Sequence, residues 1–439
     1  MKSKLKQFFV VTLMFFTISY CTQQGLEPGP SYLKDPQYET DKSMLNKNVA
    51  KSLASIIKQK EVRKFVKSNV VNQFDGDYNF LFTLEKDKSI SIENEAGRVS
   101  INTFGELLSK NFTTSSIVGR SSSSDFESLV SSLNPLMEIK IPELNGISPE
   151  DWDTENTTPI VAALASNMRD AEYIIGYDSE GNEYEIDLNK EPDQLVIIIG
   201  ENERVIGIKN EDVVSGKVNA ICEPLFVEQG VSYVLKETYY NECQEPFPRP
   251  GDVINDPAGD PPAPVCDRDS KNTMDKINRI KFRNMTIYRD AEKWANGKFE
   301  LRVIIVIGNI ANSQLATVEK FYTEDRNDLK NCSWLGTSCD TVWRTLNTNI
   351  ITWNEASYGN LMTYTWLEED SGTSTTYSIN SSTSYTDPSG TTSSVTGSVS
   401  VTITDEDYKI GGAWVEYCNN TDGNGFDYDT GRMYFSINQ

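Results

Sequence analysis

Phe299-Glu300-Leu301-Arg302-Val303-Ile304-Ile305-Val306-Ile307 is the stretch that decides the architecture of the C-terminal part of the chain. Charged and apolar residues alternate at its start, and its end is wholly apolar, so it predicts one long β-strand. Further strand patterns occupy residues 280–282, 361–368, 398–404, 413–417 and 433–437. The one helix expected here is at Thr317–Tyr322. We therefore expect residues 267–439 to form a mainly-β sandwich.

Residues 43–244 mix helix and strand patterns and predict an α+β domain. Apolar residues recur at steps of three and four over residues 44–57 and 62–71, which indicates two amphipathic helices. Residues 173–177 and 183–186 read as a hairpin. The apolar run Leu195–Gly200 fits a strand that is buried on both faces of an antiparallel or mixed sheet. The basic residues of the two helices could rest on anionic lipid, but the acidic body of the same chain is the favoured partner.

A proline-rich segment separates the two predicted domains. Residues 245–266 contain seven prolines and two glycines, so they predict a stiff linker with polyproline character.

The N-terminus predicts export. Lys2, Lys4 and Lys6 precede an apolar run that is too short to span a bilayer, as expected for a signal peptide over residues 1–20. Ile18-Ser19-Tyr20-Cys21 resembles the lipobox of bacterial lipoproteins, which implies a lipid on Cys21 and a tether over residues 21–42. The chain as a whole resembles Bacteroidetes-type lipoproteins, so the implied location is the outer membrane or cell surface. The alternative is ordinary signal-peptide cleavage and a soluble product.

Composition excludes several classes of function. The formal charge of −23 repels nucleic acid, so no nucleic-acid partner is expected. There is no histidine, which removes Ser-His-Asp and Cys-His catalysis and the zinc motifs built on histidine. Any metal site would use oxygen ligands, and calcium is the metal expected.

Six cysteines besides Cys21 fit an oxidising compartment. The favoured disulfide joins Cys332 to Cys339 around a short loop, while Cys222–Cys243 and Cys266–Cys418 are weaker candidates. A bridge from Cys243 to Cys266 would close the linker into a loop. Six buried free thiols are the alternative.

Part of the C-terminal domain resembles a C2 domain. The resemblance rests on Asn349-Ile350-Ile351-Thr352-Trp353-Asn354-Glu355 and on Val401-Thr402-Ile403-Thr404-Asp405-Glu406-Asp407-Tyr408-Lys409-Ile410-Gly411. It covers only residues 349–411, and the family's first calcium loop is not visible. It implies a β-sandwich with Asp405 and Asp407 as calcium ligands.

A second oxygen-rich stretch lies at residues 420–429. Asn420, Asp422 and Asn424 occupy ligand positions of an EF-type calcium loop, and Asp427 and Asp429 follow. Gly431 stands where that loop needs a bidentate acid, so an ordinary hairpin loop is the alternative. With Asp405 and Asp407, these residues form the predicted calcium set.

Two further motifs invite functional hypotheses. The Ser/Thr-rich tract 371–396 resembles the hairpins of pore-forming toxins, but an exposed hairpin needs fewer assumptions. Residues 150–155 surround Trp152 with acids, as a glycan site would.

Together these patterns favour a surface lipoprotein that works as a non-enzymatic binding or adhesion module, stabilised by calcium. Its ligand would be an unidentified extracellular protein or glycan. The N-terminal lipid would attach the protein to a membrane. The alternative is a carboxylate-dependent hydrolase of an extracellular polymer, which would require facing carboxylates in a deep cleft.

Overall fold

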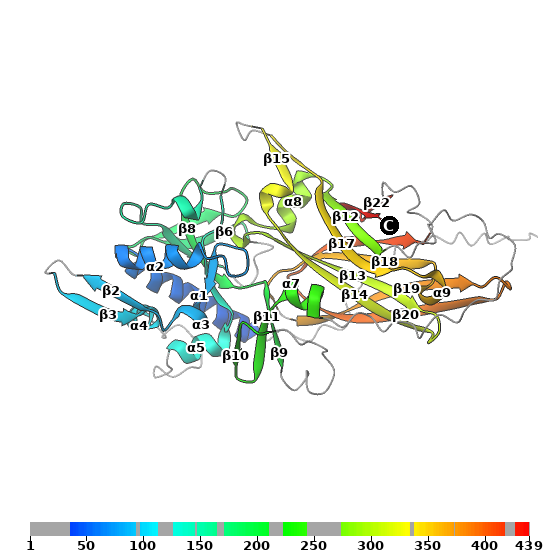
Figure 1. The fold of residues 1–439 in the computed structure, drawn as a ribbon. Helices are drawn as coiled ribbons and strands as arrows, with labels where there is room; N and C mark the ends of the chain where they lie inside the picture. The colour runs from blue at the N-terminus through cyan, green and yellow to red at the C-terminus, as the bar shows by residue number, and fades with distance from the viewer. Residues whose placement is uncertain are drawn as a thin grey trace, which may run out of the picture.

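The computed structural model describes residues 36–93, 97–112, 126–144, 147–164, 171–209, 223–243, 274–333, 338–372, 374–417 and 426–438. The predicted signal peptide, Cys21 and the predicted linker 245–266 lie outside these ranges. Figure 1 shows an elongated molecule in which a mixed N-terminal part meets a β-rich C-terminal part. No helix in the described ranges is long and apolar enough to cross a membrane.

A six-stranded mixed sheet organises the N-terminal part, in the order β1-β4-β8-β5-β6-β7. β8 is antiparallel to β4 and parallel to β5, and its first five residues are buried, which confirms the prediction for Leu195–Gly200. The expected hairpin at residues 173–186 is also confirmed. The strands are β1 (Asn79–Leu81), β4 (Met137–Lys140), β5 (Ile160–Ala163), β6 (Tyr173–Tyr177), β7 (Glu183–Asp187) and β8 (Val196–Glu201).

Helices cover this sheet. The long helix α1 (Pro36–Ile56) buries Leu45, Val49 and Leu53 completely, because their spacing places them on one face. It begins at Pro36, so residues 36–42 belong to the helix although the sequence placed them in the tether. The others are α2 (Lys60–Val70), α3 (Phe82–Glu85), α4 (Phe104–Asn111), α5 (Phe126–Leu133) and the 3₁₀ turn η1 (Pro149–Asp151).

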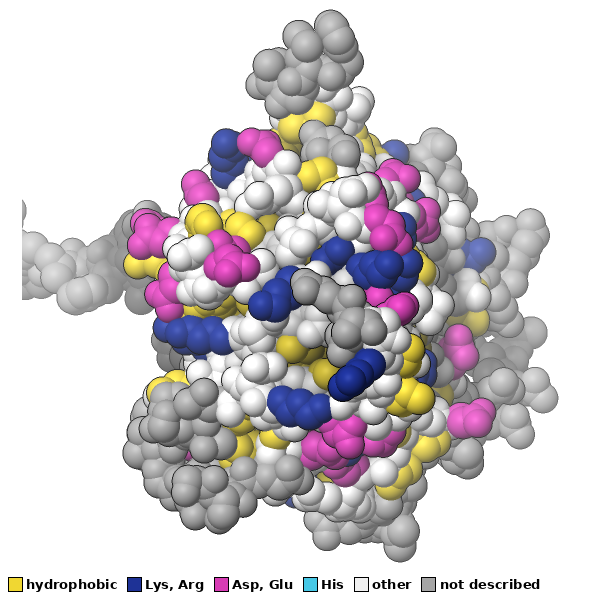
Figure 2. Space-filling model, turned by 90° about the vertical axis from the view of Figure 1, so that its left-hand side faces the viewer, with side chains coloured by type: hydrophobic (Ala, Val, Ile, Leu, Met, Phe, Trp, Pro, Cys, Tyr) yellow, Lys and Arg dark blue, Asp and Glu magenta, His cyan; other side chains and the backbone are white. Residues whose placement is uncertain are grey.

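The basic side chains of α1 and α2 rest on the acidic body of the chain, as the sequence favoured. Lys51 pairs with Glu183 at 3.2 Å, and Lys64 pairs with Glu155 at 2.5 Å. The buried Arg63 donates to the carbonyl of Thr154. Figure 2 shows basic and acidic side chains intermingled on this end of the molecule.

Two smaller elements complete the N-terminal part. β2 (Ser89–Glu93) and β3 (Val99–Thr103) form a hairpin. β9 (Val205–Lys209), β10 (Phe226–Glu228) and β11 (Val231–Leu235) form a separate three-stranded sheet, followed by α7 (Lys236–Thr238) and the π-turn η2 (Tyr239–Cys243).

Two four-stranded sheets form the C-terminal sandwich, in the orders β17-β12-β23-β22 and β14-β13-β18-β21. Their facing apolar side chains make one buried cluster that includes Trp366, Tyr364 and Phe435. The molecule is thus α+β with a sandwich-like C-terminal part. The strands are β12 (Met274–Phe282), β13 (Phe299–Asn309), β14 (Gln314–Glu324), β17 (Arg344–Thr352), β18 (Leu361–Glu368), β21 (Tyr408–Glu416), β22 (Phe426–Asp429) and β23 (Met433–Asn438).

The helix expected at Thr317–Tyr322 is wrong. These residues lie in β14, which pairs with β13 along its whole length. The helices found in the C-terminal part are α8 (Met285–Ala291) and α9 (Glu355–Tyr358), with 3₁₀ turns η3 (Trp294–Asn296) and η4 (Arg326–Asp328).

The Ser/Thr-rich tract forms a long two-stranded ribbon of β19 (Ser374–Thr386) and β20 (Thr392–Thr404). Its apolar face is buried against β13 and β18 in a cluster of Tyr377, Ile379, Val401 and Ile403 with Ile304, Val306 and Leu367. The tract is therefore part of the packed sandwich and not a free-standing hairpin.

Candidate functional site

A cavity of about 800 Å³ lies at the junction of the two parts, and its volume is in the usual range for ligand sites. The N-terminal part supplies Ile147 and the segment 188–193 that follows β7. The C-terminal part supplies residues of α8, η3 and η4, and residues of both strands of the small hairpin of β15 (Lys330–Cys332) and β16 (Cys339–Thr341). Both parts of the chain therefore build this site.

Basic side chains dominate the charge of the cavity. Three carboxyl groups, those of Glu191, Asp193 and Glu292, also lie in its wall. Five cations line the same wall and outnumber these acids, although the whole chain has a formal charge of −23. The five cations are Lys190, Arg289, Lys293, Arg326 and Lys330.

Few of these cations are neutralised within the protein. Lys330 pairs with Glu191 at 3.4 Å, and Lys293 donates to the amide oxygen of Asn189 at 2.9 Å. Burial lowers the pKa of Lys330, and the neighbouring guanidinium groups lower it further, against the opposing effect of Glu191. Such mutual repulsion among cations is relieved when an anion binds.

Two more cations are available to a ligand. Lys190 and Arg289 are exposed, and neither makes a hydrogen bond or ion pair within the described residues. Arg289 comes from α8, which Asn284 caps by accepting a hydrogen bond from the Ile287 amide at 3.0 Å. The cap fixes the start of the helix and thereby the position of the arginine at the cavity.

Aromatic residues and a disulfide also form part of the cavity wall. Tyr288 is buried, and the guanidinium of Arg326 lies 5.4 Å from its ring. Trp294 is buried in an apolar cluster with strands of the N-terminal sheet and donates from Nε1 to the carbonyl of Asp187. Cys332 and Cys339 line the cavity and form a disulfide, which confirms the favoured pairing.

The other cysteines are only partly described. Cys243 is also disulfide-bonded. Cys222, Cys266 and Cys418 lie outside the described residues, so the remaining pairings stay predictions.

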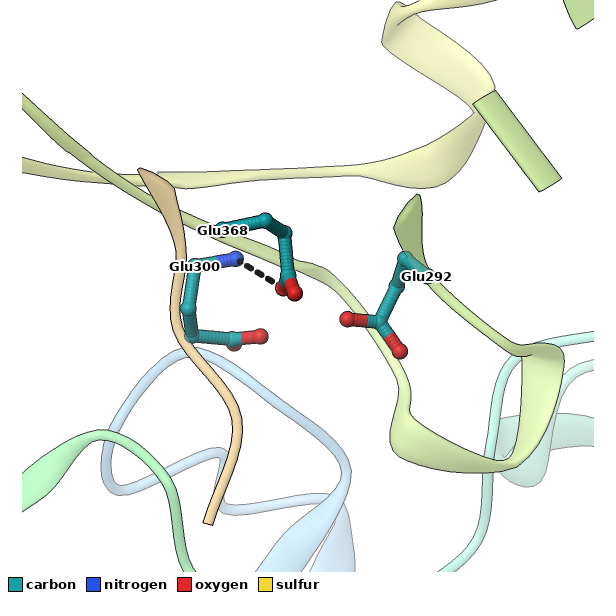
Figure 3. Close-up of side chains that lie close together, drawn as sticks. All are labelled: Glu292, Glu300 and Glu368. Carbon is teal, nitrogen blue, oxygen red and sulfur yellow. Dashed lines mark hydrogen bonds between the residues drawn. The ribbon is translucent and has the colours of Figure 1, made fainter. Parts of the chain in front are cut away.

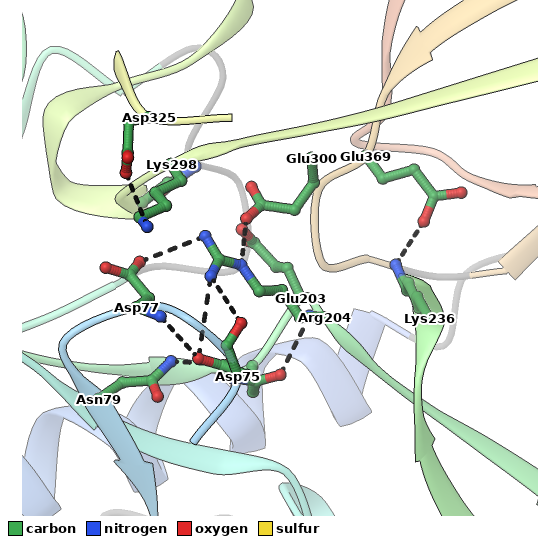
Figure 4. Close-up of polar contacts among 12 residues, drawn as sticks. Asp75, Asp77, Asn79, Glu203, Arg204, Lys236, Lys298, Glu300, Asp325 and Glu369 are labelled. Carbon is green, nitrogen blue, oxygen red and sulfur yellow. Dashed lines mark hydrogen bonds and ion pairs between the residues drawn. The ribbon is translucent and has the colours of Figure 1, made fainter. Parts of the chain in front are cut away.

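A buried layer of charged residues joins the two parts next to the cavity (Figure 4). Arg204, which precedes β9, lies 2.6 Å from Glu300 on β13, 3.8 Å from Asp75 and 3.6 Å from Asp77. Lys140 on β4 pairs with Glu138 at 2.7 Å and donates to the carbonyl of Asn296 in η3. All these side chains are almost wholly excluded from water.

A second group in the same layer is centred on Glu369. Its carboxylate accepts hydrogen bonds from Lys236 and, at 2.7 Å, from Arg302. Burial alone would raise the pKa of Glu369, but these two cations outweigh it and lower the pKa to about 2. Lys236 belongs to the N-terminal part, so this pair also bridges the junction.

Three carboxyl groups converge at the C-terminal side of the layer (Figure 3). Glu292 follows α8, Glu300 begins β13 and Glu368 ends β18. One carboxylate oxygen from each lies within 4.8 Å of the others, and all three residues are at most 1% exposed. Burial raises the pKa of Glu292 to about 7, with the nearby Glu203 as a further cause.

Four of the predicted calcium ligands lie in the described ranges, where they contact other groups of the protein. Asp407 is buried, and its carboxylate accepts hydrogen bonds from the amides of Asp370 and Thr404, so it stabilises the turn between β20 and β21. Asp405 is exposed nearby. Asp427 and Asp429 pair with Arg279 and Arg283 at 3.3 and 3.6 Å.

The structure does not bring Asp405, Asp407, Asp427 and Asp429 into one metal-binding group. Within the described ranges, the only group of three acids close enough to hold an ion is the carboxylate triad. Asn420, Asp422 and Asn424 lie outside these ranges.

Trp152 is not an exposed platform for a sugar. It is 4% exposed and packs in the main N-terminal core, and its Nε1 donates to the carbonyl of Thr157. The surrounding acids form an ordinary loop over this buried ring.

Sequence reasoning missed both the basic cavity and the triad. The cavity cations are scattered over residues 190–330 and have no common spacing. One signal was present: Glu300 and Arg302 interrupt a strand that is otherwise strongly apolar. Charged residues in a buried strand need buried partners, so this pair could have marked the charged layer.

No known family model, curated protein or solved structure matches this chain.

Proposed function

We propose that this chain is a lipid-anchored binding protein that holds an anionic extracellular ligand in the basic cavity. The observation that supports this proposal is the excess of cations around a cavity in a strongly acidic protein. Guanidinium and ammonium groups without internal partners are suited to carboxylate or sulfate groups. An acidic glycan is the ligand class that fits both this charge and a cell-surface location.

The alternative hydrolase is not favoured by the carboxylate geometry. The oxygens of Glu292, Glu300 and Glu368 are close together, but the three residues are at most 1% exposed. A glycosidase needs its two carboxyl groups on either side of the bond to be cleaved, with space for the sugar between them. A buried triad offers no such space.

The test is calorimetric titration of the purified chain with an oligogalacturonide and with a neutral maltooligosaccharide of equal length. We expect heat of binding with the acidic sugar only. The double variant Lys190→Gln/Arg289→Gln should weaken binding about a hundredfold or more, because each of the two lost charge-assisted contacts is worth about 1.5–3 kcal/mol. Arg98→Gln, at the distant β2–β3 hairpin, is the control. Equal binding of both sugars, or equal loss in the control, would refute the proposal.

The lipid anchor is a separate part of the proposal and rests on the resemblance of Ile18–Cys21 to a lipobox. Metabolic labelling with a fatty-acid analogue should mark the full chain and leave Cys21→Ser unlabelled. An unlabelled wild-type chain, or a serine variant that still sediments with membranes, would contradict lipidation of Cys21.

We also infer a C2-like arrangement for the C-terminal sandwich, supported only by the sequence resemblance over residues 349–411. We do not extend this inference to a C2-type calcium site, because Asp407 is buried and its carboxylate accepts a hydrogen bond from the amide of Thr404.

A further inference from the structure

The carboxylate triad of Glu292, Glu300 and Glu368 has the dimensions of a cation site. Two ligands on opposite sides of Ca²⁺, each at about 2.4 Å, are about 4.8 Å apart. The nearest oxygens of the triad lie within 4.8 Å of one another. Figure 3 shows the carboxylate of Glu292 pointing toward the other two.

The oxygens of the triad lack hydrogen-bond donors. Both oxygens of Glu292, Oε2 of Glu300 and Oε2 of Glu368 are buried and accept no hydrogen bond from another group of the described residues. Glu292 and Glu368 lie close enough to hydrogen-bond to each other when one of them is protonated. The remaining oxygens are used: Arg204 donates to Glu300 Oε1 at 2.6 Å, and the Glu300 amide donates to Glu368 Oε1 at 3.4 Å. Buried carboxylate oxygens without donors are costly unless a proton or a cation satisfies them.

A separate unpaired oxygen belongs to Asn296, which shares a small cavity with Glu300. Asn296 is 5% exposed, and its Oδ1 has no hydrogen-bond partner. Asn296 and Glu300 line the same small cavity of about 10 Å³, which is about the size of one water molecule. A neutral amide oxygen cannot be satisfied by protonation, so it needs a donor or a cation.

The local charge balance also favours a cation. Four cations face the carboxyl groups of this region: Lys140 and Arg204 form ion pairs with them, Lys236 acts on Glu203 and Arg326 acts on Glu292. The carboxyl groups exceed these cations by three. They belong to Asp75, Asp77, Glu138, Glu203, Glu292, Glu300 and Glu368. A divalent ion removes two of these excess charges and leaves every existing ion pair in place.

We propose that Glu292, Glu300 and Glu368 bind one calcium ion, with Asn296 as a neighbouring oxygen donor. Calcium accepts six to eight oxygen ligands and tolerates bidentate carboxylates. Magnesium usually keeps several waters, and three carboxyl groups that are at most 1% exposed do not provide space for them. Glu292 is also a wall residue of the large basic cavity.

The competing arrangement is a proton shared between Glu292 and Glu368. Burial raises the pKa of both groups, and the charge of Glu292 raises that of Glu368 further. Proton and calcium would occupy the same oxygens, so calcium should bind more tightly as the pH rises. The two arrangements therefore differ in whether metal is retained at neutral or alkaline pH.

The test uses the purified full chain at pH 8, stripped with EGTA and then dialysed against calcium. Elemental analysis should find one calcium per chain. The melting temperature should rise by about 3 °C once calcium is 100-fold above its Kd. Glu292→Gln should retain no calcium and show no rise. This variant removes a buried charge without changing shape, so its fold is not endangered, and Glu368→Gln provides a second version.

The controls separate this site from the one predicted from sequence. Glu180→Gln changes an exposed acid in the β6–β7 loop and should keep the calcium. Asp427→Asn/Asp429→Asn should keep it too. Calcium retained by both triad variants, calcium lost only from the double variant, or a wild-type chain that retains none would each overturn the proposal. None of these measurements uses the anionic ligand, so the result is independent of the proposed function.

Discussion

Arg204 is the residue that contacts the largest number of buried acids at the junction. Its guanidinium lies between Asp75 and Asp77 of the N-terminal part and Glu300 of the C-terminal part. Its carboxylate partners are nearly inaccessible to water. Arg204 supplies a cation to all three, and the side-chain amides of Asn79 and Asn202 also donate to Asp75. Arg204 therefore links the two parts of the molecule by ion pairs and not by burying apolar surface.

Arg204→Met should destabilise the protein strongly. Methionine keeps part of the side-chain volume but leaves three buried carboxylates without their cation, which typically costs about 3–5 kcal/mol. Urea denaturation, followed by tryptophan fluorescence, would measure the change in the free energy of unfolding.

Arg279→Met is the matched control for this prediction. Arg279 pairs with Asp427 at 3.3 Å, but both side chains are more than a third exposed. Such pairs contribute at most about 1 kcal/mol. If the two variants lost similar stability, the buried layer would not hold the parts together as described.

Single residues also show where sequence reasoning succeeds. The placement of Lys51 and Lys64 on the acidic body followed from charge alone, and the structure confirms it. Asp407 illustrates the opposite case. Its sequence context resembles a metal-binding loop, but whether its oxygens face an ion or the amides of Asp370 and Thr404 depends on the local backbone, which a motif does not specify.

At the scale of elements, the two faces of β13 explain much of the C-terminal part. Leu301, Val303 and Ile305 point into the sandwich core. On the other face, Glu300 and Arg302 meet the charged layer, and Ile304 and Val306 meet the β19–β20 ribbon. The strand could be predicted from sequence because both of its faces are buried.

β14 could not be predicted in the same way. It is the edge strand of its sheet, and the ribbon and η2 each cover part of it, so most of its residues are half-buried. A strand covered unevenly on both faces does not show the strict alternation that identifies a strand. Its apolar residues are instead spaced three and four apart, as in a helix.

The buried face of the ribbon yields a prediction at this scale. Ile379→Ala should destabilise the protein by about 2–5 kcal/mol, because Ile379 is 2% exposed and its removal leaves a cavity. Asn380→Ala, at the next position on the exposed face, should change stability by less than about 0.5 kcal/mol. Thermal unfolding of both variants would check this. Equal effects would mean that the ribbon is not packed on the sandwich in solution.

At the scale of the whole molecule, the junction is the feature that the sequence concealed. Its ion pairs join residues far apart in the chain, such as Arg204 with Glu300 and Lys236 with Glu369. Apart from Glu300, which stands in an otherwise apolar strand, these charges are indistinguishable in sequence from solvated surface residues, and most charged residues are indeed exposed. Only the packing of the two parts decides which of them are buried.

The buried acids of this junction should make the calcium-free protein less stable as the pH rises from about 4.5 to above 7. Burial raises the pKa of Glu292 and of Asp407 to about 7, whereas both groups titrate near 4 in the unfolded chain. Between these values the folded state binds more protons, so its stability falls with increasing pH, by up to about 3 kcal/mol for Glu292 alone. Urea denaturation in EGTA at pH 5, 6, 7 and 8 would measure this slope, and Glu292→Gln should reduce it. Stability that rises from pH 5 to pH 8 would show that these carboxyl groups are ionised without penalty and that the junction is more open to water than described.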